Sequence, residues 1–159
     1  MNHNTGRKRR SPPAPTRSRR GPRCGRVRDQ ELKRIVHRYY HEVLTLRHLD
    51  VLEGLVAPDF VGHDGAGGLM DRYGLREAAD MLLDAFPDLI VTVEDQIAEG
   101  NRISTRWWAS GTHAGTFAGI SPTGRTVTIS GIDIHRVERG RIAELWEELD
   151  VASLLAQLL

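Results

Sequence analysis

The chain has 159 residues, 40% of them apolar, which leaves room for one globular domain with a substantial core and a short additional segment. Its net charge is only +1, and no apolar run approaches the ~20 residues that a membrane-spanning helix needs. The single cysteine, Cys24, excludes an internal disulfide and a thiolate metal cluster. We therefore expect a soluble protein of the reducing cytoplasm.

The near-neutral charge hides a basic first segment, residues 1–28, and an acidic remainder, residues 29–159. The first segment holds ten Lys and Arg and no acidic residue, whereas the remainder holds 12 basic and 21 acidic residues. Rich in Pro, Gly, Ser and Arg, residues 1–28 are predicted to be a disordered tail. Two interpretations of the tail stay open: weak contact with a polyanion, and a segment that is not made because translation starts at Val27. Its lack of aromatic residues argues against specific nucleic-acid recognition.

Three helices are predicted before any long strand. The first begins at Asp29, which is a favoured N-cap residue type, and is indicated by apolar residues at helical spacing. These residues are Leu32, Ile35, Val36, Tyr39, Val43 and Leu46. A short second helix is expected around residues 50–56 and a third over about residues 75–86. Between them lies a glycine-rich loop, residues 62–68, which carries His63.

Four strands are predicted to follow as an antiparallel meander. They span residues 89–99, 102–113, 126–137 and 142–149. Gly100-Asn101 and Arg139-Gly140 supply tight hairpin turns between them. Asp150 is expected to cap a last helix, residues 151–158, which closes over the sheet.

Asp133 is the leading candidate for chemistry, because strand alternation places it on an otherwise apolar face. That face also carries Val127, Ile129, His135 and Val137. Ionising a carboxyl in an apolar site is costly, so burial raises its pKa and readies it to exchange a proton near neutral pH. The alternative is a strand aspartate that hydrogen-bonds a neighbouring loop or caps a turn.

Alternation also gives the facing of the preceding strand, where Trp107 and His113 point the same way as Ile103 and Gly111. If this face coincides with that of Asp133, one hollow is surrounded by Trp107, His113, Asp133 and His135. The opposite face is partly apolar as well, through Trp108, Ile132 and Ile134. Three helices cannot cover both faces, so we predict a homodimer.

Residues 30–159 resemble the SnoaL-like polyketide cyclases, or ester cyclases, of the NTF2-like superfamily. The resemblance is carried by Gly111-Thr112-His113, Gly115-x-Phe117-x-Gly119, Pro122-Thr123-Gly124-Arg125, Gly131-Ile132-Asp133-Ile134-His135-Arg136 and Gly140-Arg141-Ile142-x-Glu144-x-Trp146 with Asp150. It implies an α+β fold, a cone in which N-terminal helices pack on a curved antiparallel sheet. Because the superfamily hosts isomerases, hydrolases, cyclases and non-catalytic binders, the fold alone does not decide the function.

In the characterised cyclases of this family, an intramolecular aldol condensation closes the last ring of an anthracycline-type polyketide methyl ester without metal or cofactor. By that resemblance, Asp133 removes a proton flanked by carbonyls and then returns it to the aldol oxygen. The alternative function is a non-catalytic small-molecule-binding protein on the same scaffold. In such a protein Asp133 would be paired with Arg136, Arg106 or a backbone amide.

The resemblance also suggests roles for three histidines. His113 either hydrogen-bonds the forming oxyanion or orients Asp133, or else it faces solvent where its strand enters a loop. His63 either contacts substrate carbonyls or is an ordinary loop residue. His135 stands where an aromatic residue is expected in the family, and either tunes Asp133 or marks the rim of the pocket.

Three aromatic residues complete the predicted substrate-binding set, although aromatic residues in such a chain more often belong to the core. They are Trp107, Phe117 and Trp146, of which Trp146 is expected nearest a flat substrate. No HxH or HExxH spacing is present, so a metal is not expected. The resemblance implies that no cofactor is used.

Overall fold

The computed structural model describes residues 22–159, which form four α-helices, two shorter helical segments and six strands. Residues 1–21, most of the predicted basic tail, lie outside the described residues. The first helix, α1 (Pro22–Arg38), begins seven residues before Asp29, so the prediction that Asp29 caps it is wrong. Proline is favoured at a first helical position, since the N–H that it lacks has no helical partner there.

α1 continues directly into a π-helical segment, η1 (Tyr39–Thr45). The backbone N–H of Leu46 donates to the carbonyl of His41, five residues earlier, at 2.8 Å. Such a turn is wider than an α-helical turn and is often found at functional sites. Here it buries Tyr39 and Tyr40 together.

The middle of the chain folds as a series of short elements followed by one long helix. These elements are η2 (Leu49–Val51), α2 (Leu52–Leu55), β1 (Val56–His63), β2 (Leu69–Met70) and α3 (Arg72–Ala85). The short second helix and the third helix were both predicted, but part of the predicted glycine-rich loop is strand. Asp71 caps α3 by accepting a hydrogen bond from the backbone N–H of Gly74 at 2.9 Å.

Four long strands follow, and their antiparallel meander was predicted nearly to the residue. They are β3 (Ile90–Glu99), β4 (Arg102–Thr112), β5 (Thr126–Glu138) and β6 (Arg141–Leu149). At the last hairpin, Arg139 and Gly140 both adopt positive φ angles of 50° and 76°, as a type I′ turn requires. The chain ends in α4 (Val151–Leu158), whose cap is Asp150, as predicted.

The six strands are ordered β2-β1-β6-β5-β4-β3 in one sheet. β1 pairs with β6 in parallel, so the sheet is mixed rather than wholly antiparallel as expected. A parallel pair needs a long connection, and α3 with the three strands β3–β5 supplies it. The fold is otherwise the predicted α+β cone.

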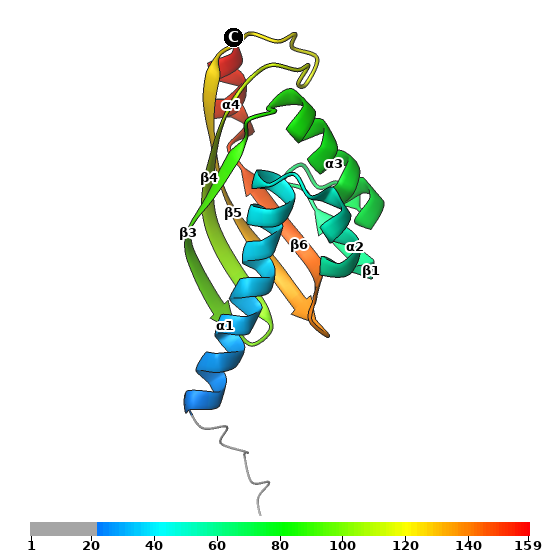
Figure 1. Ribbon diagram of the computed structural model, residues 1–159, viewed down its shortest axis with the longest axis vertical. Coiled ribbons are helices and arrows are strands. Elements are labelled where there is room, and N and C mark those ends of the chain that lie inside the picture. The colour runs from blue at the N-terminus through cyan, green and yellow to red at the C-terminus, as the bar shows by residue number, and fades with distance from the viewer. Residues whose placement is uncertain (1–21) are drawn as a thin grey trace, which may run out of the picture.

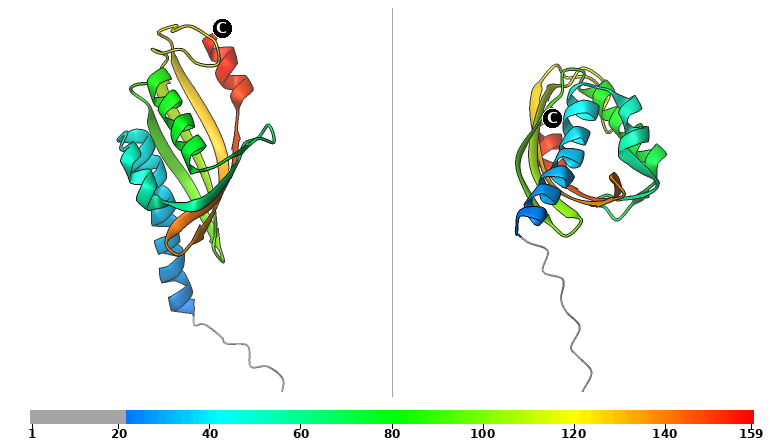
Figure 2. Two further views of the ribbon diagram at one scale, coloured as in Figure 1. Left: turned by 90° about the vertical axis from the view of Figure 1, so that its right-hand side faces the viewer. Right: turned by 60° about the horizontal axis from the view of Figure 1, so that its bottom comes forward.

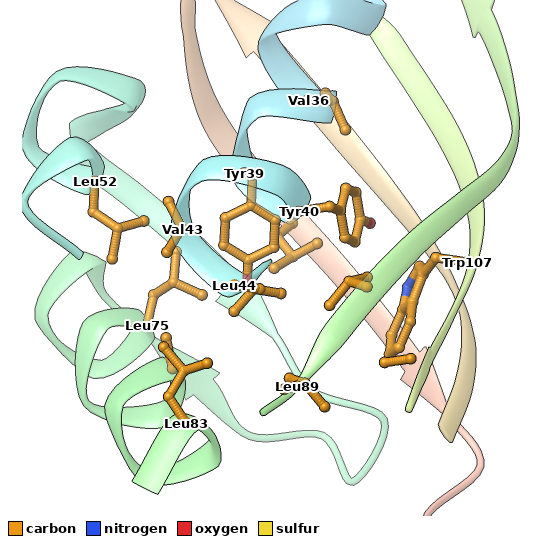
Figure 3. Close-up of a cluster of buried hydrophobic side chains, with 14 of the residues drawn as sticks. Val36, Tyr39, Tyr40, Val43, Leu44, Leu52, Leu75, Leu83, Leu89 and Trp107 are labelled. Carbon is orange, nitrogen blue, oxygen red and sulfur yellow. The ribbon is translucent and has the colours of Figure 1, made fainter. Parts of the chain in front are cut away.

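The helices α1, α2 and α3 gather on the concave face of the curved sheet, as Figures 1 and 2 show. Their buried apolar side chains form one core with the concave face, and Figure 3 shows part of it around Tyr39, Tyr40 and Trp107. None of the helices described in residues 22–159 is long and apolar enough to cross a membrane.

Candidate active site

A cavity of about 710 Å³ lies between the concave face of the sheet and the helical segments η1 and α3. Its wall is mostly apolar, with side chains such as Leu44, Leu75, Leu82, Leu89, Val91 and Ile129. This volume suits a small organic molecule, and few polar groups interrupt the wall. Among those polar groups, Asp133 and Glu147 are the two acids contributed by the sheet.

Asp133 lies in the middle of β5, faces this cavity and is only 2% exposed. Its Oδ2 atom accepts two hydrogen bonds, from Tyr40 Oη at 2.5 Å and from Trp107 Nε1 at 2.7 Å. Its Oδ1 atom has no hydrogen-bond partner among the described residues. One oxygen is therefore held in place by two side chains, and the other is buried close to the backbone of Glu148, which also favours the ionised form.

The two donors come from opposite walls of the cavity, Tyr40 from η1 and Trp107 from β4. Their rings face one another with centroids 6.1 Å apart, and both are labelled in Figure 3. Gly131 makes room for the indole, because a Cβ atom at this position would lie 2.6 Å from Trp107 Cζ2. The spacing Gly131-x-Asp133 thus allows Trp107 to reach the carboxylate.

Burial raises the pKa of Asp133 from its ordinary 3.8 to about 7. The hydrogen bonds from Tyr40 and Trp107 oppose this rise, because they stabilise the ionised form, whereas the nearby charge of Glu147 adds to it. Asp133 therefore holds and releases its proton near neutral pH, as a general acid/base must. The prediction that Asp133 faces an apolar hollow agrees with this geometry.

Two other predicted site residues also line the cavity. Trp107 does so beside Asp133, and Phe117 does so from the segment that follows β4. Phe117 packs edge-on against Phe86, with ring centroids 5.5 Å apart. Trp107 and Phe117, together with Tyr39 and Tyr40, give the cavity an aromatic lining.

His113 does not meet Asp133, so the prediction that it orients this carboxyl is wrong. It follows the end of β4, eight residues beyond Thr105, the cross-strand partner of Asp133. At ~3.3 Å per residue this is roughly 25 Å along the strand. His113 is fully buried rather than solvent-facing, and its Nδ1 accepts a hydrogen bond from the Thr123 backbone N–H at 3.2 Å. It anchors the segment between β4 and β5.

His135 is fully buried and is not among the residues that line the cavity, so it does not mark the rim as predicted. Its ring lies against Tyr39 and Tyr40, with centroid distances of 6.0 and 5.7 Å. Burial lowers the pKa of His135 to about 3, so the ring is neutral. It therefore packs against Tyr40, the tyrosine that donates to Asp133.

His63 and Trp146 do not line the cavity either. They stack with ring centroids 5.2 Å apart, and His63 Nε2 lies 2.9 Å from Glu144 Oε1. In β6, Leu145 and Glu147 point to the concave side, which sends Trp146 to the other face. Neither of these two predicted substrate-binding residues therefore reaches this cavity, so the structure does not bring them together with Asp133.

Two cavity residues were missed by sequence reasoning, Tyr40 and Glu147. Tyr40 lies four residues after Val36 and three before Val43, on the apolar stripe of the first helix, so helical spacing carried a signal that it faces the sheet. Glu147 carried a signal, because it lies between Leu145 and Leu149 at the spacing that keeps strand residues on one face. In the structure it is the direct cross-strand partner of Asp133.

A family model for SnoaL-like polyketide cyclase matches residues 34–158.

Among solved structures, IdmH from Streptomyces antibioticus, assigned as a polyketide cyclase, is 34% identical and has a TM-score of 0.72. That match covers 80% of this chain and 97% of the other. AclR from Streptomyces galilaeus, assigned as a hydroxylase, is 25% identical over 82% of each chain, with a TM-score of 0.76. TsrD from Streptomyces laurentii is 25% identical over 81% of this chain and 95% of its own, with a TM-score of 0.73. No curated protein sequence matches the chain.

Proposed function

Because the chain belongs to the SnoaL-like polyketide cyclase family, we propose that it catalyses an intramolecular aldol condensation, or a related proton transfer, on a carbonyl-rich small molecule. Asp133 is the general acid/base, and the reaction uses no cofactor. The observation that carries this proposal is the buried Asp133 carboxyl, which lines an apolar cavity, is held there by Tyr40 and Trp107, and has a pKa raised to about 7.

In the first step, the carboxylate of Asp133 removes a proton from a carbon flanked by carbonyl groups. The electron pair left on that carbon is delocalised into the carbonyls, and the carbon then attacks a second carbonyl carbon of the same molecule. Tyr40 and Trp107 hold the carboxylate in one orientation throughout. A general base of this kind accelerates the reaction by ~10²- to 10⁴-fold, so the shape of the cavity must supply much of the rest.

The non-catalytic alternative expects Asp133 to be paired with Arg136, Arg106 or a backbone amide. The backbone of Glu148 does favour the ionised form of Asp133, but neither arginine pairs with it. Arg136 instead pairs with Glu144 and Glu138, and Arg106 pairs with Glu94. A purely binding protein has no use for an acid whose pKa is raised to about 7 inside its ligand cavity.

We further propose that the enzyme is a homodimer that pairs through the convex face of the sheet. Figures 1 and 2 show no helix on this face. Three large apolar side chains stay partly exposed there: Trp108 at 37%, Ile132 at 53% and Ile134 at 40%. An apolar cluster of this kind is typical of a surface that another chain covers.

The test uses the full-length protein with a panel of polyketide methyl esters and simpler keto esters in deuterated water. Mass spectrometry follows deuterium uptake and ring closure, and Asp133→Asn is the comparison variant. We expect either reaction to fall by about 10² or more in the variant, the scale of a lost general base. Equal inactivity of both proteins, with equal ligand affinity, would instead favour the binding protein.

A further inference from the structure

A second carboxyl faces the same cavity beside the first, on the neighbouring strand. Asp133 in β5 and Glu147 in β6 are cross-strand partners, and both side chains line the cavity. The Cβ atoms of such partners lie ~5 Å apart, within reach of one small molecule bound between them. The other titratable groups of the wall are Tyr39, Tyr40 and Asp84, and no Lys, Arg or His of the described residues lines it.

The two carboxyls differ in their hydrogen bonding. Asp133 accepts from Tyr40 and Trp107, and both bonds stabilise its ionised form. No hydrogen bond contributes at Glu147, where burial, and then the charge of Asp64, raises the pKa. Repulsion between neighbouring carboxylates is mutual, so the pair keeps one proton over the pH range between its two ionisations. The charge of Glu147 raises the pKa of Asp133, so in the free protein the shared proton lies on Asp133. The hydrogen bonds from Tyr40 and Trp107 stabilise the reactive arrangement, in which Asp133 is the ionised base and Glu147 carries the proton.

We propose that Glu147 is the acid of the reaction and protonates the oxygen that forms when the ring closes. This inference rests on the aldol chemistry proposed above, and it assigns the second proton transfer to Glu147 rather than to Asp133. The new carbon–carbon bond turns the attacked carbonyl into an alkoxide, and the alkoxide takes the Glu147 proton to become an alcohol. Asp133 then holds the carbon proton and Glu147 is ionised, and transfer of that proton from Asp133 to Glu147 restores the starting state.

The experiment separates the two proton transfers. The probe is a β-keto ester that also carries a second ketone, placed so that attack by the carbon between its ester and first ketone closes a six-membered ring. Deuterium uptake at its activated carbon reports the first transfer, and ring closure reports both. Glu147→Gln keeps the size of the side chain but cannot release a proton. We expect it to close the ring about 10²-fold more slowly and to exchange deuterium within about threefold of wild type.

Two comparison variants give this result its meaning. Glu148→Gln makes the same change one residue away, at an exposed position, and is expected to leave both rates unchanged. Glu147→Asp retains a carboxyl and is expected to close the ring at least about tenfold faster than Glu147→Gln. The proposal is overturned if Glu147→Gln closes the ring at the wild-type rate, or loses exchange and closure in equal proportion, as a merely structural residue would.

The wild-type protein supplies an independent measurement if Glu147→Gln does not fold. Exchange needs ionised Asp133 and rises with pH, whereas closure also needs protonated Glu147. The ratio of closure to exchange is therefore expected to fall as pH rises, and a constant ratio contradicts the proposal.

If Asp133→Asn loses both reactions while Glu147→Gln loses neither, only the role of Glu147 is refuted. If wild type shows neither reaction, the aldol function fails and this inference fails with it.

Discussion

Tyr40 Oη and Asp133 Oδ2 lie 2.5 Å apart, in a hydrogen bond that joins η1 to β5 across 93 residues of sequence. Burial, together with the charge of Asp133, raises the pKa of Tyr40 well above its usual value, so Tyr40 remains a donor. This bond favours the ionised carboxyl that a base must present, while burial opposes ionisation. The balance between these two effects sets the pH at which the site works.

Tyr40→Phe is expected to shift that balance toward the protonated form of Asp133. A hydrogen bond to a charged group contributes ~1.5–3 kcal/mol, so its loss raises the apparent pKa of Asp133 by about one unit or more. At pH 7, deuterium exchange into the substrate falls several-fold, and the fall is recovered at higher pH. The measurement is the pH profile of exchange, with Tyr73→Phe at an exposed position as the matched control. An unchanged profile in Tyr40→Phe contradicts the role given to this bond.

Asp133→Asn is expected to stabilise the folded protein at alkaline pH. The folded-state pKa of Asp133, about 7, lies above its usual 3.8, so the folded state binds this proton more tightly than the unfolded state does. The contribution of this group to wild-type stability is therefore fully present below about pH 4 and is lost as the pH rises through 7. The variant avoids this loss, which amounts to a few kcal/mol. Urea unfolding at pH 5 and pH 8 should show its advantage growing with pH, and a constant difference would count against a raised pKa.

His135→Phe is expected to stabilise the protein, most of all in acid. Both ring nitrogens of His135 are buried without a partner among the described residues, which costs about 1–3 kcal/mol for each unsatisfied group. Its folded-state pKa, about 3, lies below the usual 6.5, so wild-type stability falls as pH drops from 6.5 toward 3. Thermal unfolding at pH 7 and pH 4 should show a larger gain at pH 4. A melting temperature below that of wild type at both values would show that the larger ring does not fit.

Ile132→Asp is expected to convert the proposed dimer into a monomer. Ile132 is 53% exposed on the convex face, where a partner would cover it, and a buried unpaired carboxylate is strongly unfavourable. Light scattering after size-exclusion chromatography gives the mass directly. Tyr73→Asp, at a 68% exposed position on α3, on the other side of the sheet, is the comparison. A wild-type protein that is monomeric at micromolar concentration refutes the dimer.

Alternation along β5 was enough to place Asp133 on a buried apolar face, because a strand fixes the side to which each residue points. The same rule could not place His113, since facing one side of a long strand does not fix the position along it. Tyr40 was within reach, because it lies four residues after Val36 at α-helical spacing. Helical spacing does not reveal the π-helical turn that follows it, or the hydrogen bond from its hydroxyl to Asp133. The parallel pairing of β1 with β6 likewise joins segments that are distant in sequence and carry no local signal.

The π-helical turn of η1 makes the length of this segment as important as its composition. Each residue of an α-helix advances the chain by about 100° around the axis. Deleting one residue between Tyr40 and Thr45 would restore α-helical spacing and rotate α1 by about that angle relative to the sheet. Leu32 and Val36 would then leave the core, and Tyr40, which precedes the deletion, would leave Asp133. Homologous enzymes that retain this hydrogen bond should therefore tolerate substitutions here far more readily than insertions or deletions.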